Sequence, residues 1–366
     1  MSLSQVHVRK DELTNATVVE ADSGELADGA VRLKVESFSV TANNITYAVV
    51  GDGFGYWNFF PPKADDPEGL GIVPMWGHAK VVDSNHSDIA VGERVYGYLP
   101  MGTQLDVRPG NISEASFSDR TDYRQPMSPV YNQYSRLAAD PEHDPGREAE
   151  RMIYGPLFKT GFIIDYFMRS ESWFDAEQVI LTSASSKTAM GLASVAKQNS
   201  PSIKRIGLTS SGNVDFVEST GLYDQVLTYE EVGMVPIAPT VTVDFAGNAS
   251  LLAKLHEHFA DTLKYSCLVG ATHIEERGEG GMRAERGLPG PKPTLFFAPD
   301  HFVAFFKEHG PVEGGRMIAK TWHGFLDAVE GTVEIVKLQG LDAARETYLT
   351  MVSGSVNPAK GIVIEP

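Results

Sequence analysis

Cysteine is nearly absent from this sequence, since the 366 residues contain only Cys267. A single thiol excludes a disulfide framework and any zinc site built from several cysteines. It suits a reducing compartment, so we expect a cytoplasmic protein. The first residues, MSLSQVHVRKDEL, contain no apolar core of a secretory signal, and no window approaches the ~18 apolar residues of a membrane span. We therefore expect neither secretion nor membrane insertion.

Positive charge is also scarce. Lys and Arg total 31 against 48 Asp and Glu, which gives a formal net charge of −17. An acidic protein repels nucleic-acid phosphates and anionic membranes, so we expect neither as a partner. Hydrophobic residues make up 42% and charged residues 22% of the chain, as in ordinary globular proteins. At roughly 100–200 residues per domain, the length suits two domains.

The most informative stretch covers residues 178–198, QVILTSASSKTAMGLASVAKQ. Its apolar run at 179–181 is too short for a helix and is typical of a buried parallel strand. Small residues follow at 182–188, and apolar residues then recur at helical spacing. A strand, a tight turn and a helix in this order present helix N-terminal amides to a phosphate. We therefore expect an anion site at this turn.

The first part of the chain has the pattern of a β domain. Alternating residues at 31–35 and 38–41, with Pro and Gly between later runs, predict that residues 1–110 are all β and form a small barrel. Residues 104–150 are polar and rich in Pro, Asp and Arg. We expect much of this segment to be surface loop, with a return strand at 129–134.

From residue 152 onward, helical and strand patterns alternate. An aromatic helix is expected at 152–168, and strands are expected at 179–181, 206–209, 224–227, 241–245, 267–270 and 294–297. This alternation predicts a doubly wound parallel sheet. Helices at 302–308, 314–329 and 341–352 and strands at 333–337 and 361–364 should follow. The predicted domains are residues 1–150, completed by 330–366, and residues 151–329.

Several motifs occur in a fixed order along nearly the whole chain. They are residues 41–47 (TANNITY) with Gly51 and Asp52, 92–97 (GERVYG), 155–161 (GPLFKTG), 178–198, and 360–364 (KGIVI). Their order resembles the medium-chain dehydrogenase/reductase superfamily, most of all its zinc-free quinone-oxidoreductase and enoyl-reductase branches. The resemblance implies an α/β protein with a GroES-like β-barrel domain and a Rossmann doubly wound parallel sheet. It also implies a homodimer, with residues 292–297 as a candidate edge strand.

The resemblance implies a dinucleotide at the turn. Relatives have a Gly-rich sequence where this chain has Ala184 to Ala189, and Ser186 stands at the second glycine position. The implied cofactor contacts are Thr160, Ser183, Ala184, Ser185, Ser186, Lys187, Thr188 and Gly270. Hydroxyls and a lysine favour an anion at a helix start. The alternative is a small-residue turn without a ligand.

The residues at the end of the second strand indicate whether the cofactor is NAD or NADP. NAD-selective sites place a carboxylate there to bind the ribose. Here residues 208–213 read LTSSGN, with no carboxylate before Asp215. We therefore expect NADP(H), with Ser210, Ser211 and Asn213 near the 2′-phosphate, and with Lys187 and Tyr229 assisting. The alternative is that these are only turn residues.

Zinc-dependent members of the superfamily use a cysteine and a Gly-His-Glu segment. Here Gly77 and His78 are followed by Ala79, and Cys267 lies far away in sequence. A zinc site usually needs three protein ligands, so we expect no metal and place His78 in the core or a cleft. His256 and His258 are two residues apart on a polar helix, so we expect them to point apart into solvent.

A zinc-free reductase needs a proton donor beside the hydride acceptor. Tyr47 is the expected donor, because some enoyl reductases that the chain resembles carry a tyrosine in this neighbourhood. A phenol of pKa ~10 donates at neutral pH if a neighbour stabilises the phenolate. Asn43 or Asn44 is expected to bind the substrate carbonyl or the nicotinamide ribose. The alternative for Tyr47 is packing under the barrel.

The predicted function is reduction of an activated double bond or carbonyl in a small molecule such as an enone, enal or quinone. The aromatic-rich residues 53–62 suit a flat substrate, although burial in the barrel is the more common fate of such residues. Residues 186–188 (SKT) resemble the end of a phosphate-binding P-loop, but Leu181 and Ser186 occupy both of its glycine positions.

A non-catalytic nucleotide-binding sensor or scaffold on the same fold remains the alternative.

Overall fold

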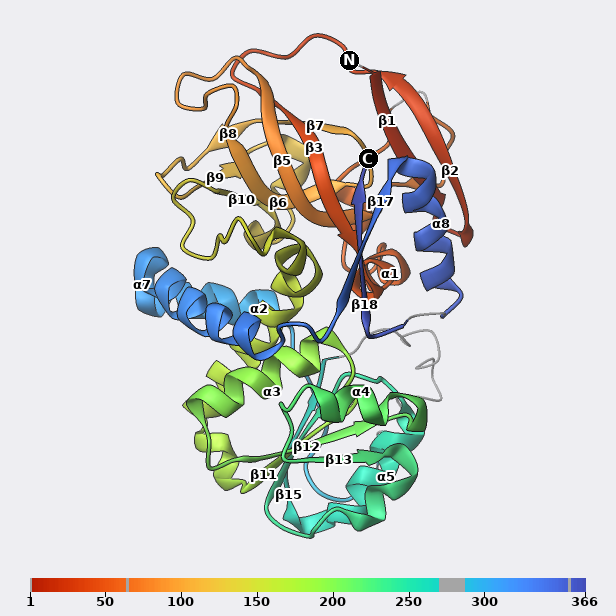
Figure 1. The fold of residues 1–366 in the computed structure, drawn as a ribbon, viewed down its shortest axis with the longest axis vertical. Helices are drawn as coiled ribbons and strands as arrows, with labels where there is room; N and C mark the ends of the chain where they lie inside the picture. The colour runs from red at the N-terminus through yellow and green to blue at the C-terminus, as the bar shows by residue number, and fades with distance from the viewer. Residues whose placement is uncertain (1, 64–65, 270–286, 355–356) are drawn as a thin grey trace. The chain divides into compact units, whose positions relative to one another are not determined.

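The computed structural model of the chain describes residues 2–63, 66–269, 287–354 and 357–366. The chain divides into two compact units, which are coloured along the sequence in Figure 1. Unit 1 comprises Met1–Ile153 and Glu334–Pro366, and unit 2 comprises Tyr154–Val333.

Unit 1 is built on a nine-stranded sheet. Its order is β17 (Glu334–Gln339), β18 (Lys360–Glu365), β3 (Val31–Val40), β5 (Pro74–Ser84), β6 (Arg94–Pro100), β10 (Gln133–Arg136), β9 (Ser116–Asp119) and β8 (Pro109–Gly110), with β7 (Gln104–Val107) also paired to β3. The alternation predicted at 31–35 and 38–41 belongs to one long strand, β3. The end of the chain joins the same sheet, because β18 pairs antiparallel with β3.

A smaller antiparallel sheet completes unit 1. It has the order β2 (Glu12–Asp22), β1 (Ser2–Arg9) and β4 (Leu70–Gly71). Helix α8 (Gly340–Val352) packs against β1 and β2. Leu341, Ala344 and Tyr348 form its buried face, at the spacing of one side of a helix.

The prediction that residues 1–110 are all β is wrong at one place. Residues Ala42–Val49 form helix α1, and a single 3₁₀ turn, η1, follows at Tyr56–Asn58. The Asn44 side chain starts the helix, because its Oδ1 accepts the backbone N–H of Thr41 at 2.7 Å. An Asn side chain that satisfies a backbone donor at a helix start stabilises the first turn.

Much of segment 104–150 lies at the surface outside helices and strands, as predicted, but parts of it join the sheet. Besides β7 to β10, the segment contains the 3₁₀ turns η2 (Asp122–Arg124) and η3 (Pro129–Asn132). The expected return strand begins only at Gln133, since Pro129 opens a helical turn and cannot donate to a strand ladder.

Unit 2 contains a six-stranded sheet in which all neighbours are parallel. Its order is β13 (Gln225–Thr228), β12 (Lys204–Thr209), β11 (Gln178–Leu181), β14 (Thr240–Asp244), β15 (Leu263–Leu268) and β16 (Thr294–Leu295). Counted from β11, this is the order 3-2-1-4-5-6 of a dinucleotide-binding doubly wound sheet. The predicted fold class is confirmed.

Helices connect and cover these strands (Figure 1). They are α2 (Glu148–Ser170, which begins in unit 1), α3 (Lys187–Asn199), α4 (Val214–Ser219), α5 (Ala249–Phe259) and α7 (Ala298–Ala328), with 3₁₀ turns at Ser172–Asp175, Ser211–Asn213 (η5), Tyr229–Met234 (η6) and Ala260–Thr262. The two helices expected at 302–308 and 314–329 form α7, which breaks at Gly310, where φ is +73°.

Close packing fixes α2 against α3. A Cβ on Gly161 of α2 would lie 2.4 Å from the backbone nitrogen of Leu192 in α3. Only glycine permits this approach. On the sheet, Ile180, Ile206 and Leu255 of β11, β12 and α5 share one buried cluster.

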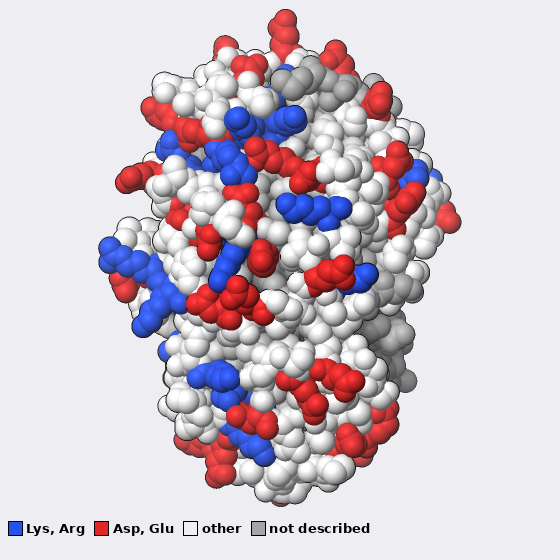
Figure 2. All heavy atoms as spheres, viewed as in Figure 1, with Lys and Arg blue, Asp and Glu red and all other residues white. Residues whose placement is uncertain are grey.

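Within the described residues, no helix is long and apolar enough to cross a membrane. Figure 2 shows one face of the molecule, where Lys and Arg lie singly or in small groups beside Asp and Glu.

Candidate functional site

The turn after β11 is tight and lies directly against β12. Ser183 adopts a left-handed backbone with φ of +47°, a conformation that is uncommon outside glycine. The Ala184 N–H donates to the carbonyl of Leu208 at 3.0 Å. Gly207 makes room for this contact, because a Cβ there would lie 2.9 Å from the Cβ of Ala184. The predicted strand, turn and helix are confirmed.

Ser186 begins helix α3. Its Oγ accepts the backbone N–H of Ala189 at 3.2 Å, so it is the N-cap of the helix. Serine is among the best residues at this position. Capping of α3 therefore explains why serine, and not glycine, stands at this position of the turn. The positive end of the α3 dipole also lies at this turn.

The ends of three neighbouring strands bring four of the predicted cofactor residues together. After β11 and β12, Asn213 Nδ2 donates to Ser185 Oγ at 3.3 Å. After β11 and β13, the hydroxyls of Ser183 and Tyr229 lie 3.4 Å apart. Neutral donors and acceptors thus surround the start of α3, a donor set that fits a phosphate.

The remaining predicted cofactor residues lie on separate elements and do not form one group. Ser210 and Ser211 are exposed at the start of η5, beyond β12, and Thr188 is partly exposed in the first turn of α3. Thr160 lies on α2, where its hydroxyl donates to the carbonyl of Pro156 at 3.3 Å. Gly270 lies outside the described residues.

Lys187 supplies the cation at the turn. Its ammonium lies 5.7 Å from the centre of the Phe216 ring in α4, within reach of a cation–π contact. Burial lowers the pKa of Lys187 to about 8.

A buried pair that was not predicted from the sequence lies at the point where the strand order reverses, between β11 and β14. The Thr182 hydroxyl donates to Asp244 Oδ1 at 2.6 Å and accepts the backbone N–H groups of Phe245 and Ala246 at 2.9 and 3.1 Å. Both side chains are almost fully buried. Ligands of open α/β sheets bind at such switch points. A polar residue at the end of each flanking strand was the available signal.

In unit 1, Tyr47 lies on α1 with its hydroxyl between two N–H donors. Asn43 Nδ2 donates to the Tyr47 oxygen at 2.7 Å, and the indole Nε1 of Trp76 donates to it at 3.1 Å. Tyr47 is 5% exposed. Burial and the neighbouring Tyr56 raise the pKa of Tyr47, while hydrogen bonds with Trp76, Asn43 and Tyr98 act in the opposite direction.

Asn44 is used differently from Asn43. Besides accepting from Thr41, its amide donates to the carbonyl of Pro74 at 2.8 Å, and the side chain is buried. The oxygen of this amide therefore caps α1, and its nitrogen holds the helix against β5.

Aromatic rings surround Tyr47. The ring centres of Tyr56, Tyr98 and Tyr131 lie 4.5, 5.5 and 6.3 Å from that of Tyr47. The hydroxyls of Tyr56 and Tyr131 are 2.9 Å apart. Within the aromatic-rich residues 53–62, only Phe54 is an exposed aromatic, so most of this segment serves the core.

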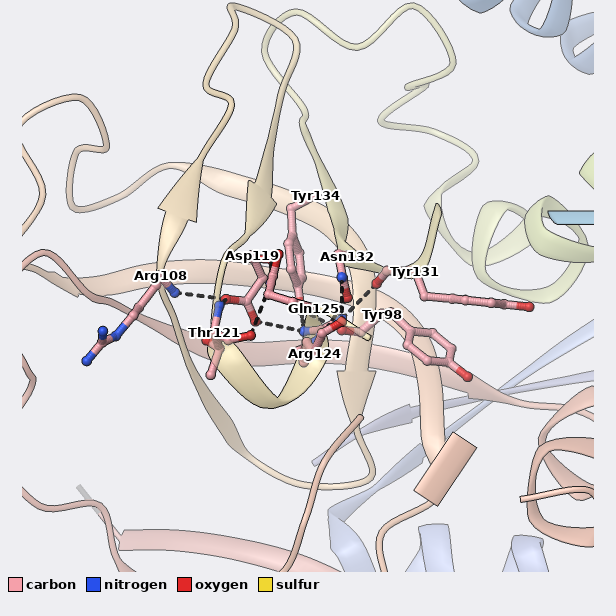
Figure 3. Close-up of polar contacts among 9 residues, drawn as sticks. All are labelled: Tyr98, Arg108, Asp119, Thr121, Arg124, Gln125, Tyr131, Asn132 and Tyr134. Carbon is pink, nitrogen blue, oxygen red and sulfur yellow. Dashed lines mark hydrogen bonds and ion pairs between the residues drawn. The ribbon is translucent and has the colours of Figure 1, made fainter. Parts of the chain in front are cut away.

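Arg124, which was not predicted from the sequence, binds the backbone of Tyr131 (Figure 3). Its guanidinium donates to Asp119 Oδ2 at 3.0 Å, Asn132 Oδ1 at 3.0 Å, the Tyr134 hydroxyl at 2.9 Å and the Tyr131 carbonyl at 2.7 Å. Four hydrogen bonds satisfy the buried charge, as burial requires. A segment with loop-like composition is thereby folded into the core.

His78 is fully buried on β5. Its ring centre lies 5.1 Å from that of Tyr96, and neither ring nitrogen has a hydrogen-bond partner within the described part of the chain. Burial lowers the pKa of His78 to about 3. Among the described residues, no group of three His, Cys, Asp or Glu is placed to hold a metal ion.

The expectation that His256 is solvated is wrong. Its Nδ1 bonds the Pro289 carbonyl at 2.8 Å, and its Nε2 bonds the Ser266 hydroxyl at 2.9 Å in a buried position. A carbonyl only accepts, so Nδ1 carries the proton. The helical spacing could not show that His256 is buried, because both of its partners come from elsewhere in unit 2.

Comparison with known proteins places the chain in a family. The sequence pattern of a family described as "Protein of unknown function (DUF2855)" matches residues 38–357. The chain belongs to the DUF2855 family. No curated protein matches the DUF2855 chain in sequence.

Solved structures share the fold of the DUF2855 chain. The quinone oxidoreductase from Coxiella burnetii is 13% identical, with a TM-score of 0.55 and full coverage of both chains. CurA from Vibrio vulnificus, solved with NADPH, is 14% identical, with a TM-score of 0.59 and coverage of 99% of this chain and 98% of that chain. The yhdH oxidoreductase from Salmonella enterica, solved with NADP, is 13% identical, with a TM-score of 0.56 and full coverage of both. The fold implied by the resemblance to the medium-chain dehydrogenase/reductase superfamily is thereby confirmed.

Proposed function

We propose that this DUF2855 protein is a zinc-independent, NADP(H)-dependent reductase of small molecules with an activated double bond or carbonyl. The observation that carries the proposal is the group of hydroxyl and amide side chains at the carboxyl ends of β11, β12 and β13. The group contains Ser183, Ser185, Asn213 and Tyr229. Two structures of the same fold were solved with NADP or NADPH, which supports the proposal.

The turn residues are proposed to bind the phosphates. The α3 N-terminus and the Lys187 ammonium attract the negative charge. Ser210, Ser211 and Asn213 follow β12 in a loop without a carboxylate before Asp215, which suits a 2′-phosphate better than a bare ribose. Ser186 is already bonded to Ala189, so the phosphate would meet the turn through its other hydroxyls.

Tyr47 is proposed to supply the proton. NADPH supplies the hydride when it is bound, and the substrate gains that hydride and one proton. The Tyr47 O–H gives its proton to the substrate, the phenolate is left with the N–H groups of Asn43 and Trp76, and solvent returns the proton. Because hydrogen bonds to an ionised oxygen are about twice as strong as neutral ones, the two donors favour this step.

A nucleotide-binding sensor or scaffold is the second candidate. Two observations favour it: Ser186 caps its own helix where relatives have glycine, and Tyr47 is only 5% exposed. Such a protein would bind NADPH without oxidising it.

The deciding experiment follows NADPH oxidation over a panel of enones, enals and quinones. The reductase proposal predicts turnover of at least one compound and its loss in Tyr47→Phe. Tyr123→Phe is the matched control, since Tyr123 is an exposed tyrosine of the same unit. Full turnover in Tyr47→Phe on every accepted compound rules out the donor role, and NADPH binding without oxidation favours the sensor.

A further inference from the structure

We infer that Trp76 is a positioning residue that orients the Tyr47 hydroxyl for proton transfer, an inference that rests on the proposed role of Tyr47. The central observation is the 3.1 Å contact between Trp76 Nε1 and the Tyr47 oxygen. An indole N–H can only donate, so the Tyr47 oxygen is the acceptor in this contact.

The second donor fills the other acceptor position. Asn43 Nδ2 donates to the same oxygen at 2.7 Å. A phenol oxygen then keeps only its own proton for a further hydrogen bond. The Tyr98 hydroxyl is the neighbour left for that bond, and its interaction with Tyr47 acts to lower the pKa of Tyr47. Trp76 and Asn43 therefore fix the direction of the Tyr47 O–H.

The two donors come from different parts of unit 1. Asn43 precedes Tyr47 by one turn of α1, so its position depends on that short helix. Trp76 lies inside β5, paired with Tyr98 on one side and Ser39 on the other. The Trp76 indole thus fixes the hydroxyl relative to the main sheet.

Aromatic contacts prevent the Trp76 ring from turning away. It stacks on Tyr96 at a centre-to-centre distance of 5.9 Å, with 23° between the rings, and lies 5.0 Å from Tyr98. The Arg151 guanidinium covers the Tyr96 ring, 4.1 Å from its centre. Trp76 is partly exposed, whereas Tyr47 is buried.

This arrangement predicts a specific kinetic effect. When Tyr47 loses its proton, its hydrogen bond from Trp76 becomes charge-assisted and strengthens. Removing the N–H therefore costs more in the transition state than in the bound ground state. Trp76→Phe should lower kcat roughly tenfold to a hundredfold while KM changes about twofold or less. Trp57→Phe, which changes another indole of unit 1, should leave kcat in the wild-type range.

The direct test is the indole ¹H–¹⁵N spectrum, because the chain has four tryptophans. Trp76→Phe assigns the Trp76 signal by its loss. In Tyr47→Phe, which removes only the acceptor oxygen, the Trp76 signal should move upfield while the other three indole signals stay in place. This spectrum reports the contact whether or not the protein turns over a substrate.

The outcomes separate the inference from the function. An unmoved Trp76 signal in Tyr47→Phe overturns the inference, as does a Trp76→Phe variant with wild-type kcat in an active enzyme. A moved signal together with full turnover in Tyr47→Phe supports the contact and overturns the donor role on which the inference rests. A moved signal with loss of kcat in both variants supports both.

Discussion

The guanidinium of Arg124 and the carboxylate of Asp119 form an ion pair at 3.0 Å, and neither side chain has any solvent exposure. Removing one partner of such a pair leaves the other charge buried and unpaired. We expect Arg124→Met to lower the free energy of unfolding by about 3–5 kcal/mol. Denaturant unfolding measures this. Arg316→Met, in an exposed pair with Glu313, should cost about 1 kcal/mol or less; equal losses in the two variants contradict the structural role of Arg124.

His78 predicts a loss of stability in acid. Burial lowers its pKa in the folded protein to about 3, whereas the unfolded chain takes up this proton below about pH 6.5. The folded state therefore loses stability as pH falls through 6.5 toward 3, by about 1.4 kcal/mol per pH unit for one group. In His78→Leu, the slope of unfolding free energy against pH should be smaller by about 1.4 kcal/mol per pH unit, the contribution of one proton. Identical slopes in the two proteins speak against a neutral, buried His78.

Lys187 predicts that NADPH binding depends on pH. Its pKa of about 8 makes it a cation below pH 8 and neutral above. If its charge attracts the phosphates, affinity should fall up to about tenfold per pH unit above 8. Titrations at increasing pH test this, with Lys187→Met expected to bind more weakly and without this pH dependence. Lys197→Met removes the charge of an exposed lysine later in α3 and should keep the wild-type profile.

The sheet edge in unit 2 bears on the proposed homodimer. β16 ends the order of described strands, and Leu295 on it is 55% exposed. An unpaired apolar edge is suited to pairing with a second copy. Light scattering should give twice the chain mass of 39.8 kDa, and Leu295→Lys should shift it toward the monomer. Val91→Lys, at an exposed position of unit 1, is the control; a monomeric wild type removes this proposal.

Elements set by local periodicity were predictable from the sequence. The short apolar run and small-residue turn at 178–188 predicted the strand, turn and helix that place Ser183 and Ser185. Helix α1 was missed because its start depends on one Asn44 hydrogen bond within a β-rich segment. The sequence signal for helix α1 was its polar cap rather than a stripe of apolar residues.

Long-range polar pairing was not predictable. Arg124 lies in a segment with the composition of a surface loop, and its burial depends on partners brought together by the fold. Trp76 and Tyr47 are 29 residues apart, so only the packing of α1 on β5 shows their contact. Burial of His256 likewise depends on Ser266 and Pro289.

The central claim is that the turn after β11 binds NADP(H). The most direct measurement is a fluorescence titration of the full chain with NADPH and NADH, repeated in Ser185→Glu, which places a carboxylate beside Asn213. Ser219→Glu makes the same change on the exposed side of α4. We predict saturable NADPH binding about tenfold or more tighter than NADH binding, lost in Ser185→Glu and kept in Ser219→Glu. No binding of NADPH, or equal affinity for the two nucleotides that Ser185→Glu leaves unchanged, would contradict the claim.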